Sequence, residues 1–262
     1  MRKSLLLIAV LGTFAVPAMA EEMAAATAEP TSPHTFTYNV GLYSQYIFRG
    51  LTQTSKNPAL QGGIDYSHSS GFYLGAWGSN ISWLSDAGYK DSSVEVDVYG
   101  GFKNTIGDTG ITYDVGALQY LYPASKTNGL TNPNTTEVYG ALGWKWFTIK
   151  DSYVVSDDAF GIQDGRGTNY AEVNGLYPIG ETGYSLLAHY GYQKFAGNGG
   201  ANDDVGTYSD WKFGGTKSWD NGVNVGGYYT TTNAKDAGYK GAFTNGRNIG
   251  ADAFTFFVQK TF

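Results

Sequence analysis

Residues 93–102 read SVEVDVYGGF and form the clearest predicted strand of the chain. Side chains of a β-strand point alternately to the two faces of a sheet. One face of this stretch therefore carries three valines and Phe102, while the other carries Glu95, Asp97 and Tyr99. The same alternation recurs at 111–119, 135–145 and 184–193. The pattern predicts an all-β protein whose sheet has one apolar and one polar face.

The rest of the chain divides into similar strands and turns. The twelve expected strands are 35–49, 59–68, 72–83, 93–103, 110–121, 135–145, 147–155, 169–177, 184–195, 207–218, 223–231 and 253–262. Short links alternate with long loops rich in Gly, Asn and Asp, and that alternation is typical of outer-membrane barrels. We therefore expect a closed antiparallel transmembrane β-barrel of about 12 strands, with short periplasmic turns and long extracellular loops.

The composition fits this class and excludes several others. Of the 262 residues, 16% are aromatic, only 15% are charged, and none is cysteine. The absence of cysteine excludes a disulfide framework and thiolate chemistry. Apolar and polar residues alternate in a barrel, so a mean hydropathy as low as −0.28 is compatible with the expected membrane-crossing strands.

The N-terminus reads as an export signal. A basic start at 1–3, an apolar stretch at 5–16 and the small-residue site at 18–20 predict cleavage before Glu21. A retained anchor is the alternative, but the apolar stretch is too short to span a bilayer. Removing two of the 17 basic residues leaves 15 against 23 acidic ones, a net charge of −8, so no nucleic-acid footprint is expected. The expected domains are 1–20 signal peptide, 21–34 periplasmic lead-in and 35–262 barrel.

The C-terminal stretch 254–262, FTFFVQKTF, ends flush on an aromatic residue. Phe254, Phe256, Val258 and Phe262 share one face, and Lys260 interrupts it. A terminal Phe that closes an alternating strand resembles the signal read by the barrel assembly machinery. The alternative is an ordinary last strand of a soluble β-protein. The expected location is the cell outer membrane, and the expected partners are its lipids, lipopolysaccharide and the assembly machinery; the oligomeric state stays open.

Several stretches together resemble the TorF family of proteobacterial outer-membrane porins. They are 39–54 (NVGLYSQYIFRGLTQT), 58–67 (PALQGGIDYS), 78–84 (GSNISWL), 95–101 (EVDVYGG), 113–116 (YDVG), 136–140 (TEVYG) and the terminal 260–262 (KTF). The resemblance covers nearly all of the chain after the signal. It implies a porin-like barrel and supplies no catalytic motif.

The polar faces of the strands supply the expected lumen. The predicted lumen-lining residues are Arg49, Asp65, Glu95, Asp97, Asp114, Glu137, Lys150, Glu172, Asp210 and Lys212. Lys145 and Lys217 are predicted on the same face, which makes seven acidic residues against five basic ones. We expect a channel for passive diffusion of small solutes or ions, with a weak cation preference. A structural or adhesive barrel with a blocked lumen is the alternative, because tyrosines such as Tyr99 and Tyr139 would fill a narrow barrel.

Catalytic, metal and cofactor sites are not expected. Ser185 and His189 lie about 13 Å apart along one strand, too far for a nucleophile and its base. Glu95 and Asp97 project the same way about 6.6 Å apart, and wall charges explain them better than acid–base chemistry. The acidic loops at 157–158 and 202–204 lack calcium-binding spacing. An outer-membrane hydrolase using His189 is the least favoured alternative, and His34 and His68 lie near strand ends.

Overall fold

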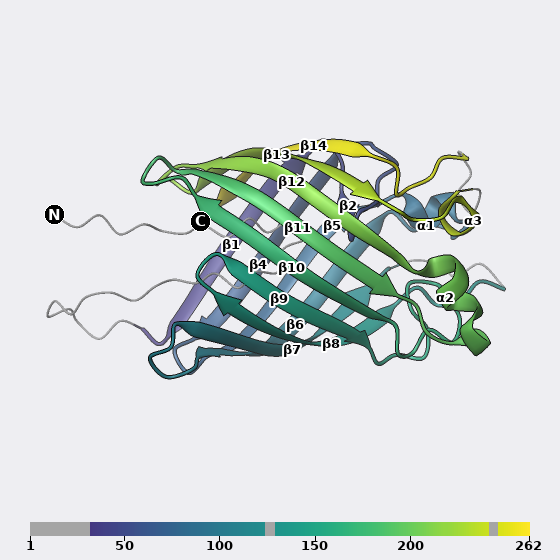
Figure 1. Ribbon diagram of the computed structural model, residues 1–262, viewed down its shortest axis with the longest axis horizontal. Helices are drawn as coiled ribbons and strands as arrows, with labels where there is room; N and C mark the ends of the chain where they lie inside the picture. The colour runs from purple at the N-terminus through teal and green to yellow at the C-terminus, as the bar shows by residue number, and fades with distance from the viewer. Residues whose placement is uncertain (1–31, 124–128, 241–245) are drawn as a thin grey trace, which may run out of the picture.

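A computed structural model describes residues 32–123, 129–240 and 246–262 of the protein. Twelve long antiparallel strands close into one barrel (Figure 1), in which each strand pairs with its neighbour in sequence and β1 pairs with both β4 and β14. The strands of the barrel are β1 (His34–Tyr43), β4 (Ala59–His68), β5 (Phe72–Asn80), β6 (Val94–Thr105), β7 (Ile111–Leu121), β8 (Thr135–Trp144), β9 (Phe147–Val154), β10 (Asn169–Pro178), β11 (Tyr184–Lys194), β12 (Tyr208–Ser218), β13 (Val223–Thr232) and β14 (Ala253–Thr261). The predicted twelve-stranded barrel is confirmed.

The first strand is shorter than predicted. It ends at Tyr43, and the following residues 44–58 turn into the barrel, so the expected strand 35–49 is wrong at its end. Arg49 and Gly50 have φ values of 47° and 78°, which a β-strand does not adopt. The short strands β2 (Ile47–Phe48) and β3 (Leu51–Thr52) pair with each other inside this segment. We call residues 44–58 the plug loop.

Helical segments occur in the long connections and not in the wall. They are α1 (Trp83–Asp86), η1 (Asn198–Gly200), α2 (Ala201–Gly206) and α3 (Asp236–Tyr239). No helix among the described residues is long and apolar enough to cross a membrane. The short connections at 69–71, 106–110, 145–146, 179–183 and 219–222 gather at the opposite end of the barrel (Figure 1). The predicted alternation of short and long connections therefore holds.

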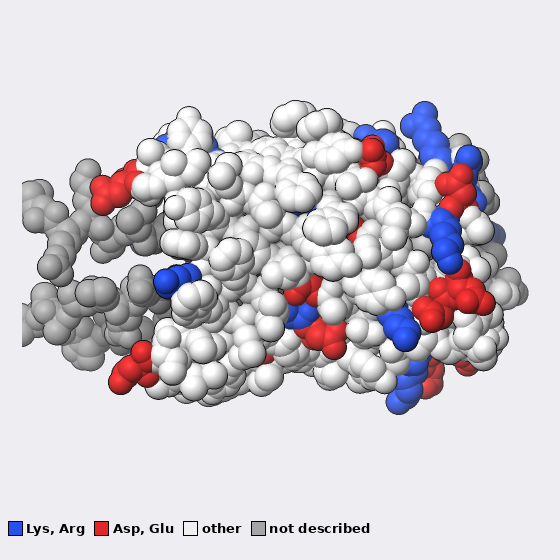
Figure 2. All heavy atoms as spheres, viewed as in Figure 1, with Lys and Arg blue, Asp and Glu red and all other residues white. Residues whose placement is uncertain are grey.

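The outer face of the barrel is apolar. Leu60, Phe254 and Phe256 each expose more than 60% of their surface, and large apolar side chains alternate outward along every strand of the wall. Most charged side chains on the face seen in Figure 2 lie at the end that carries α2 and α3. A soluble monomer rarely exposes so extended an apolar surface, whereas a membrane barrel needs a lipid-facing band. The four predicted assembly-signal residues, including Val258 and Phe262, lie on this outer face.

Tyrosines fill part of the interior by lying over glycines of neighbouring strands. The ring of Tyr99 covers Gly75, and the hydroxyl of Tyr170 covers Gly191, so closely that neither glycine has room for a Cβ. Interiors are close-packed, so even one added methyl group there would displace the ring. These contacts between tyrosines and glycines fix the positions of Tyr99 and Tyr170 inside the barrel.

Candidate functional site

All ten predicted lumen residues lie on the inner side of the barrel. Nine come from strands, and Arg49 comes from the plug loop instead of the first strand. Seven are buried, while Asp65, Lys150 and Glu172 are half-buried. The lumen wall therefore carries charges on at least seven of its strands.

Two further lysines were assigned wrongly. Lys145 lies in the β8–β9 turn over the Trp144 ring, and Lys217 lies at the short-turn rim over the Tyr184 and Trp219 rings. Lys217 has the opposite strand parity to Asp210 and Lys212, which places it on the outer face. A basic residue that the sequence reasoning missed, Lys103, follows the inward parity of Glu95 and Asp97. The inner charges are thus seven acidic against four basic.

The plug loop is anchored across the barrel by Arg49. Its guanidinium donates from Nη2 to Glu137 Oε2 at 2.7 Å and from Nη1 to Gln193 Oε1 at 2.9 Å. The Arg49 and Glu137 side chains are 7% and 2% exposed, so this ion pair is shielded from water. The guanidinium also lies 4.5 Å from the Tyr170 ring centre and 4.8 Å from that of Phe48. Cations over aromatic faces are stabilised electrostatically, so Arg49 is held by charge and by rings together.

The backbone beside Arg49 is held as firmly. Tyr208 donates its hydroxyl to the Arg49 carbonyl at 2.8 Å. A Cβ on Gly50 would lie 2.5 Å from Asp210 Cβ and 2.6 Å from Thr232 Cγ2, so only glycine fits at this turn. The plug loop is therefore in close contact with β12 and β13 as well as with β8 and β11.

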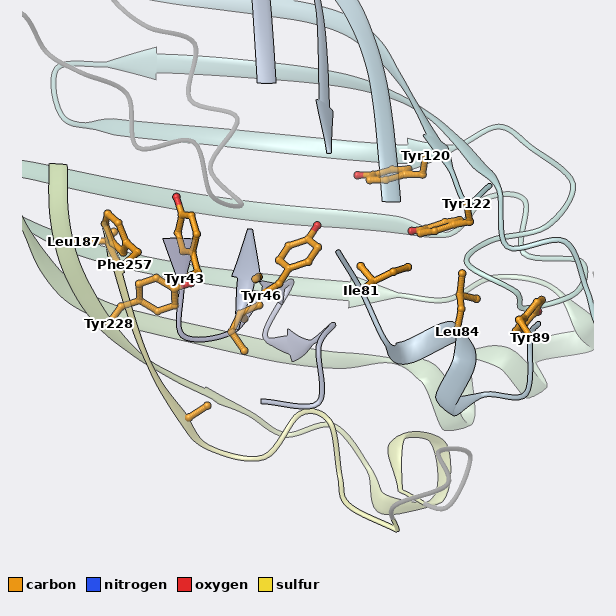
Figure 3. Close-up of a cluster of buried hydrophobic side chains, with 13 residues drawn as sticks. Tyr43, Tyr46, Ile81, Leu84, Tyr89, Tyr120, Tyr122, Leu187, Tyr228 and Phe257 are labelled. Carbon is orange, nitrogen blue, oxygen red and sulfur yellow. The ribbon is translucent and has the colours of Figure 1, made fainter. Parts of the chain in front are cut away.

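Tyr46 of the plug loop reaches a different part of the wall. Its hydroxyl donates to Glu95 Oε1 at 2.7 Å, and Tyr122 hydrogen-bonds to the same carboxylate. The hydroxyls of Tyr46 and Tyr122 point toward one another in Figure 3. The Tyr46 ring also packs edge-on against Trp77, with the ring centres 5.4 Å apart. The plug loop thus bridges β6 on one side of the barrel and β8, β11 and β12 on the others.

A second network surrounds His189 in the middle of the barrel. His189 Nε2 lies 3.0 Å from Asp210 Oδ1 and 2.9 Å from the Tyr170 hydroxyl, while Nδ1 lies 2.6 Å from Asn174 Oδ1. Glu172 Oε2 is 3.7 Å from Nδ1. These contacts with carboxylates, a phenol and an amide hold the imidazole ring in one orientation.

The half of the lumen near the short turns pairs its charges with tyrosines. Tyr99 donates to Asp65 Oδ1 at 2.5 Å, and Tyr73 donates to Asp114 Oδ1 at 2.6 Å. Tyr73 also hydrogen-bonds to Tyr139. Lys150 Nζ lies 4.2 Å from the Tyr139 ring centre. Asp65 and Asp114 therefore each have a tyrosine donor, and Lys103 lies within electrostatic reach of both.

Glu95 and Asp97 occupy consecutive inward positions of β6. Of the inner cations, Arg49 binds Glu137, Lys150 lies over the Tyr139 ring, and Lys212 lies over the Tyr228 ring. Among the described residues, Asp97 Oδ1 and Glu137 Oε1 are buried and have no hydrogen-bond partner. No group of three or more His, Cys, Asp or Glu side chains in the described ranges is arranged to hold a metal ion.

Known proteins resemble this barrel in fold. The KdgM porin superposes with a TM-score of 0.53 at 8% identity, over 86% of this chain and 98% of its own. The KdgM porin in complex with disordered oligogalacturonate gives 0.51 at 8% identity, over 87% and 98%. No curated protein matches the sequence.

One family model covers the strands of the barrel and the plug loop together. It matches residues 27–262, which is nine-tenths of the chain, and its description is a bacterial protein of unknown function (Gcw_chp). The chain belongs to this family.

Proposed function

We propose that the protein is a porin-like channel of the outer membrane through which small solutes or ions diffuse passively. The charged lumen inside a closed barrel with an apolar outer face carries this proposal. Membrane barrels have polar interiors, which form a water-filled channel in porins and are plugged in other barrels. The likeness in fold to the KdgM porin and the resemblance to the TorF porins support it.

The plug loop limits what such a channel passes. It crosses the barrel from β6 to β11, and the tyrosine layer narrows the other half of the lumen. Twelve strands lie between the filled eight-stranded barrels and the wide sixteen-stranded porins. The channel therefore admits small solutes and conducts weakly while the plug loop is in place.

Planar-bilayer recording tests this function. The protein, folded in detergent and shown to be folded by its heat-modifiable gel mobility, is expected to give small, discrete current steps in concentrated KCl. The Arg49→Met variant, which frees the plug loop, is expected to give larger steps. Folded protein that gives no steps in either form would remove the channel function.

The plug loop also favours a second function, a structural barrel with a blocked lumen that displays its long loops. The buried Arg49–Glu137 pair and the contacts of Gly50 fix the loop across the lumen. If this second function is the right one, neither the native protein nor the Arg49→Met variant conducts. The outer face would then still bind membrane lipids and lipopolysaccharide, and we propose that the C-terminal Phe262 is read by the barrel assembly machinery in either case.

A further inference from the structure

The lumen under the plug loop contains a group of carboxylates that we call the acidic site: Glu95, Asp97 and Glu137. Glu95 and Asp97 occupy consecutive inward positions of β6, and Glu137 lies on β8. Their exposed fractions are 2%, 7% and 1%, so all three are shielded from water. Asp97 is within electrostatic reach of both other carboxylates.

Asp97 differs from the other carboxylates of the lumen in what its oxygens contact, since Glu95 accepts the Tyr46 hydroxyl and Glu137 accepts the Tyr120 hydroxyl. Asp65, Asp114 and Asp210 each accept a tyrosine hydroxyl, and Glu172 accepts the Asn174 amide. Asp97, by contrast, receives no hydrogen bond from any described residue, and its Oδ1 atom is buried. Glu137 uses only Oε2, for Arg49 and Tyr120, and leaves Oε1 buried and without a partner. Two buried oxygens therefore lack donors in the same site.

The charge of the acidic site is also incomplete. When its three carboxylates are all ionised, the acidic site carries two more negative charges than the Arg49 guanidinium balances. A buried ionised carboxylate without a counter-charge is strongly unfavourable, so it takes up a proton unless a cation or a set of donors compensates its charge. The acidic site therefore has the electrostatic character of a cation-binding site. Among the described residues, the Arg49 guanidinium is the cation that pairs with it.

Arg49 shows which kind of cation this surrounding accommodates. Its guanidinium combines one carboxylate with aromatic faces, those of Phe48 and Tyr170. The same two components meet at Asp97, since Trp77 is its cross-strand neighbour and packs against the Tyr46 ring. Carboxylates with aromatic faces suit organic cations that donate hydrogen bonds.

We propose that the acidic site binds the guanidinium or primary ammonium group of an organic cation, with Asp97 as the carboxylate that receives it. This inference rests on the proposed function in one respect: the organic cation reaches the acidic site through the lumen. Arg49, as a tethered guanidinium next to the site, then competes with the solute for Glu137 and links its binding to the position of the plug loop.

Ligand binding to the folded protein in detergent tests the inference without any measurement of transport. The probes are ethylguanidinium and ethylurea, which have nearly the same shape and differ in charge, and saturation-transfer NMR reports their binding. We expect ethylguanidinium to bind and ethylurea not to bind. Asp97→Asn removes the charge at constant size and should weaken binding roughly ten- to hundredfold. Asp114→Asn, a lumen carboxylate that already has Tyr73 as donor, is the matched control and should leave binding unchanged.

The outcomes separate the inference from the channel function. Equal binding of the two probes, no binding to the native protein, or full binding by Asp97→Asn overturns the inference, as does displacement of ethylguanidinium by equimolar Mg²⁺, which would indicate a metal site. Should Asp97→Asn not form the heat-modifiable barrel, Glu95→Gln carries the same test. A protein that binds ethylguanidinium but gives no current steps retains the site and loses the channel, whereas one that conducts without binding loses only the site.

Discussion

Arg49→Met tests whether the plug loop closes the barrel. Methionine keeps most of the side-chain length, removes the charge and leaves Glu137 buried without its counter-ion at 2.7 Å. Breaking a buried ion pair by removing one partner costs about 3–5 kcal/mol. Each 1.4 kcal/mol is a factor of ten in an equilibrium constant, so the ratio of closed to open plug loop should fall by roughly a hundred- to a few thousandfold.

Two measurements report this change. The chain has no cysteine, so Gln53→Cys, at a buried position of the plug loop, is the only thiol and its labelling by a membrane-impermeant maleimide reports opening of the loop. Labelling should accelerate in the Arg49→Met background, and the single-channel conductance should rise. Arg166→Met is the control, because it breaks an equally short ion pair with Asp157 in which both side chains are more than 60% exposed. Exposed ion pairs contribute about 0–1 kcal/mol to stability, so the rate of labelling at Gln53→Cys should be the same with Arg166→Met as without it.

The reasoning also predicts non-additivity. Glu137→Gln alone leaves Arg49 buried without its carboxylate, so it should open the loop as well. The double variant Arg49→Met/Glu137→Gln contains neither of the two buried charges. Its plug loop should therefore open less than the sum of the two single-variant effects would give. Labelling and conductance that are the same in Arg49→Met as in the native protein would refute the plug, and strict additivity would show that the two side chains act separately.

Three further predictions concern packing, assembly and selectivity. Gly75→Val should displace the Tyr99 ring and lower the free energy of unfolding in urea by about 1–3 kcal/mol. The control Gly140→Val should be nearly neutral, because an added Cβ there meets nothing within 4 Å. Equal losses of stability in the two variants would contradict the packing argument. Deleting Phe262 should reduce the amount of barrel in the outer membrane several-fold while folding into detergent is unchanged, as gel mobility of the two preparations measures, and an equal loss in detergent would point to stability instead. Seven inner acidic residues against four basic ones predict cation preference in reversal potentials across a KCl gradient, which Lys212→Gln should increase. An anion preference in the native protein would contradict that last prediction.

The wall of the barrel could be predicted from the sequence because each strand carries its own signal. Alternation along 93–102 already separates Glu95 and Asp97 from the valines, and the structure places those two faces inside and outside. The end of a strand is indicated by local features, such as a glycine or the point where the alternation of apolar and polar residues stops. Most predicted strand ends therefore lie within two residues of the ends in the structure. Lys217 was misplaced because one residue of parity moves a side chain to the other face of the wall.

The plug loop could not be predicted in the same way. Tyr46, Ile47 and Phe48 have high strand propensity, and Gly50 is the first residue after them that locally indicates a turn. The contacts that turn the segment inward join residues 88 and 144 positions apart, from Arg49 to Glu137 and to Gln193. No local pattern contains such pairings, because they arise only when the barrel has closed.

The plug loop also changes what the predicted lumen residues mean. Glu95, Asp97 and Glu137 were expected as charges in a water-filled path, where a carboxylate needs no partner. Beneath the plug loop they are nearly inaccessible to water, and burial makes their charge costly. The position of the loop and the occupancy of the acidic site are therefore thermodynamically linked, since any ligand that binds only one state of the loop shifts the equilibrium toward that state. Ethylguanidinium should accordingly accelerate labelling at Gln53→Cys in the native background and have less effect in Arg49→Met, where the competing guanidinium is absent.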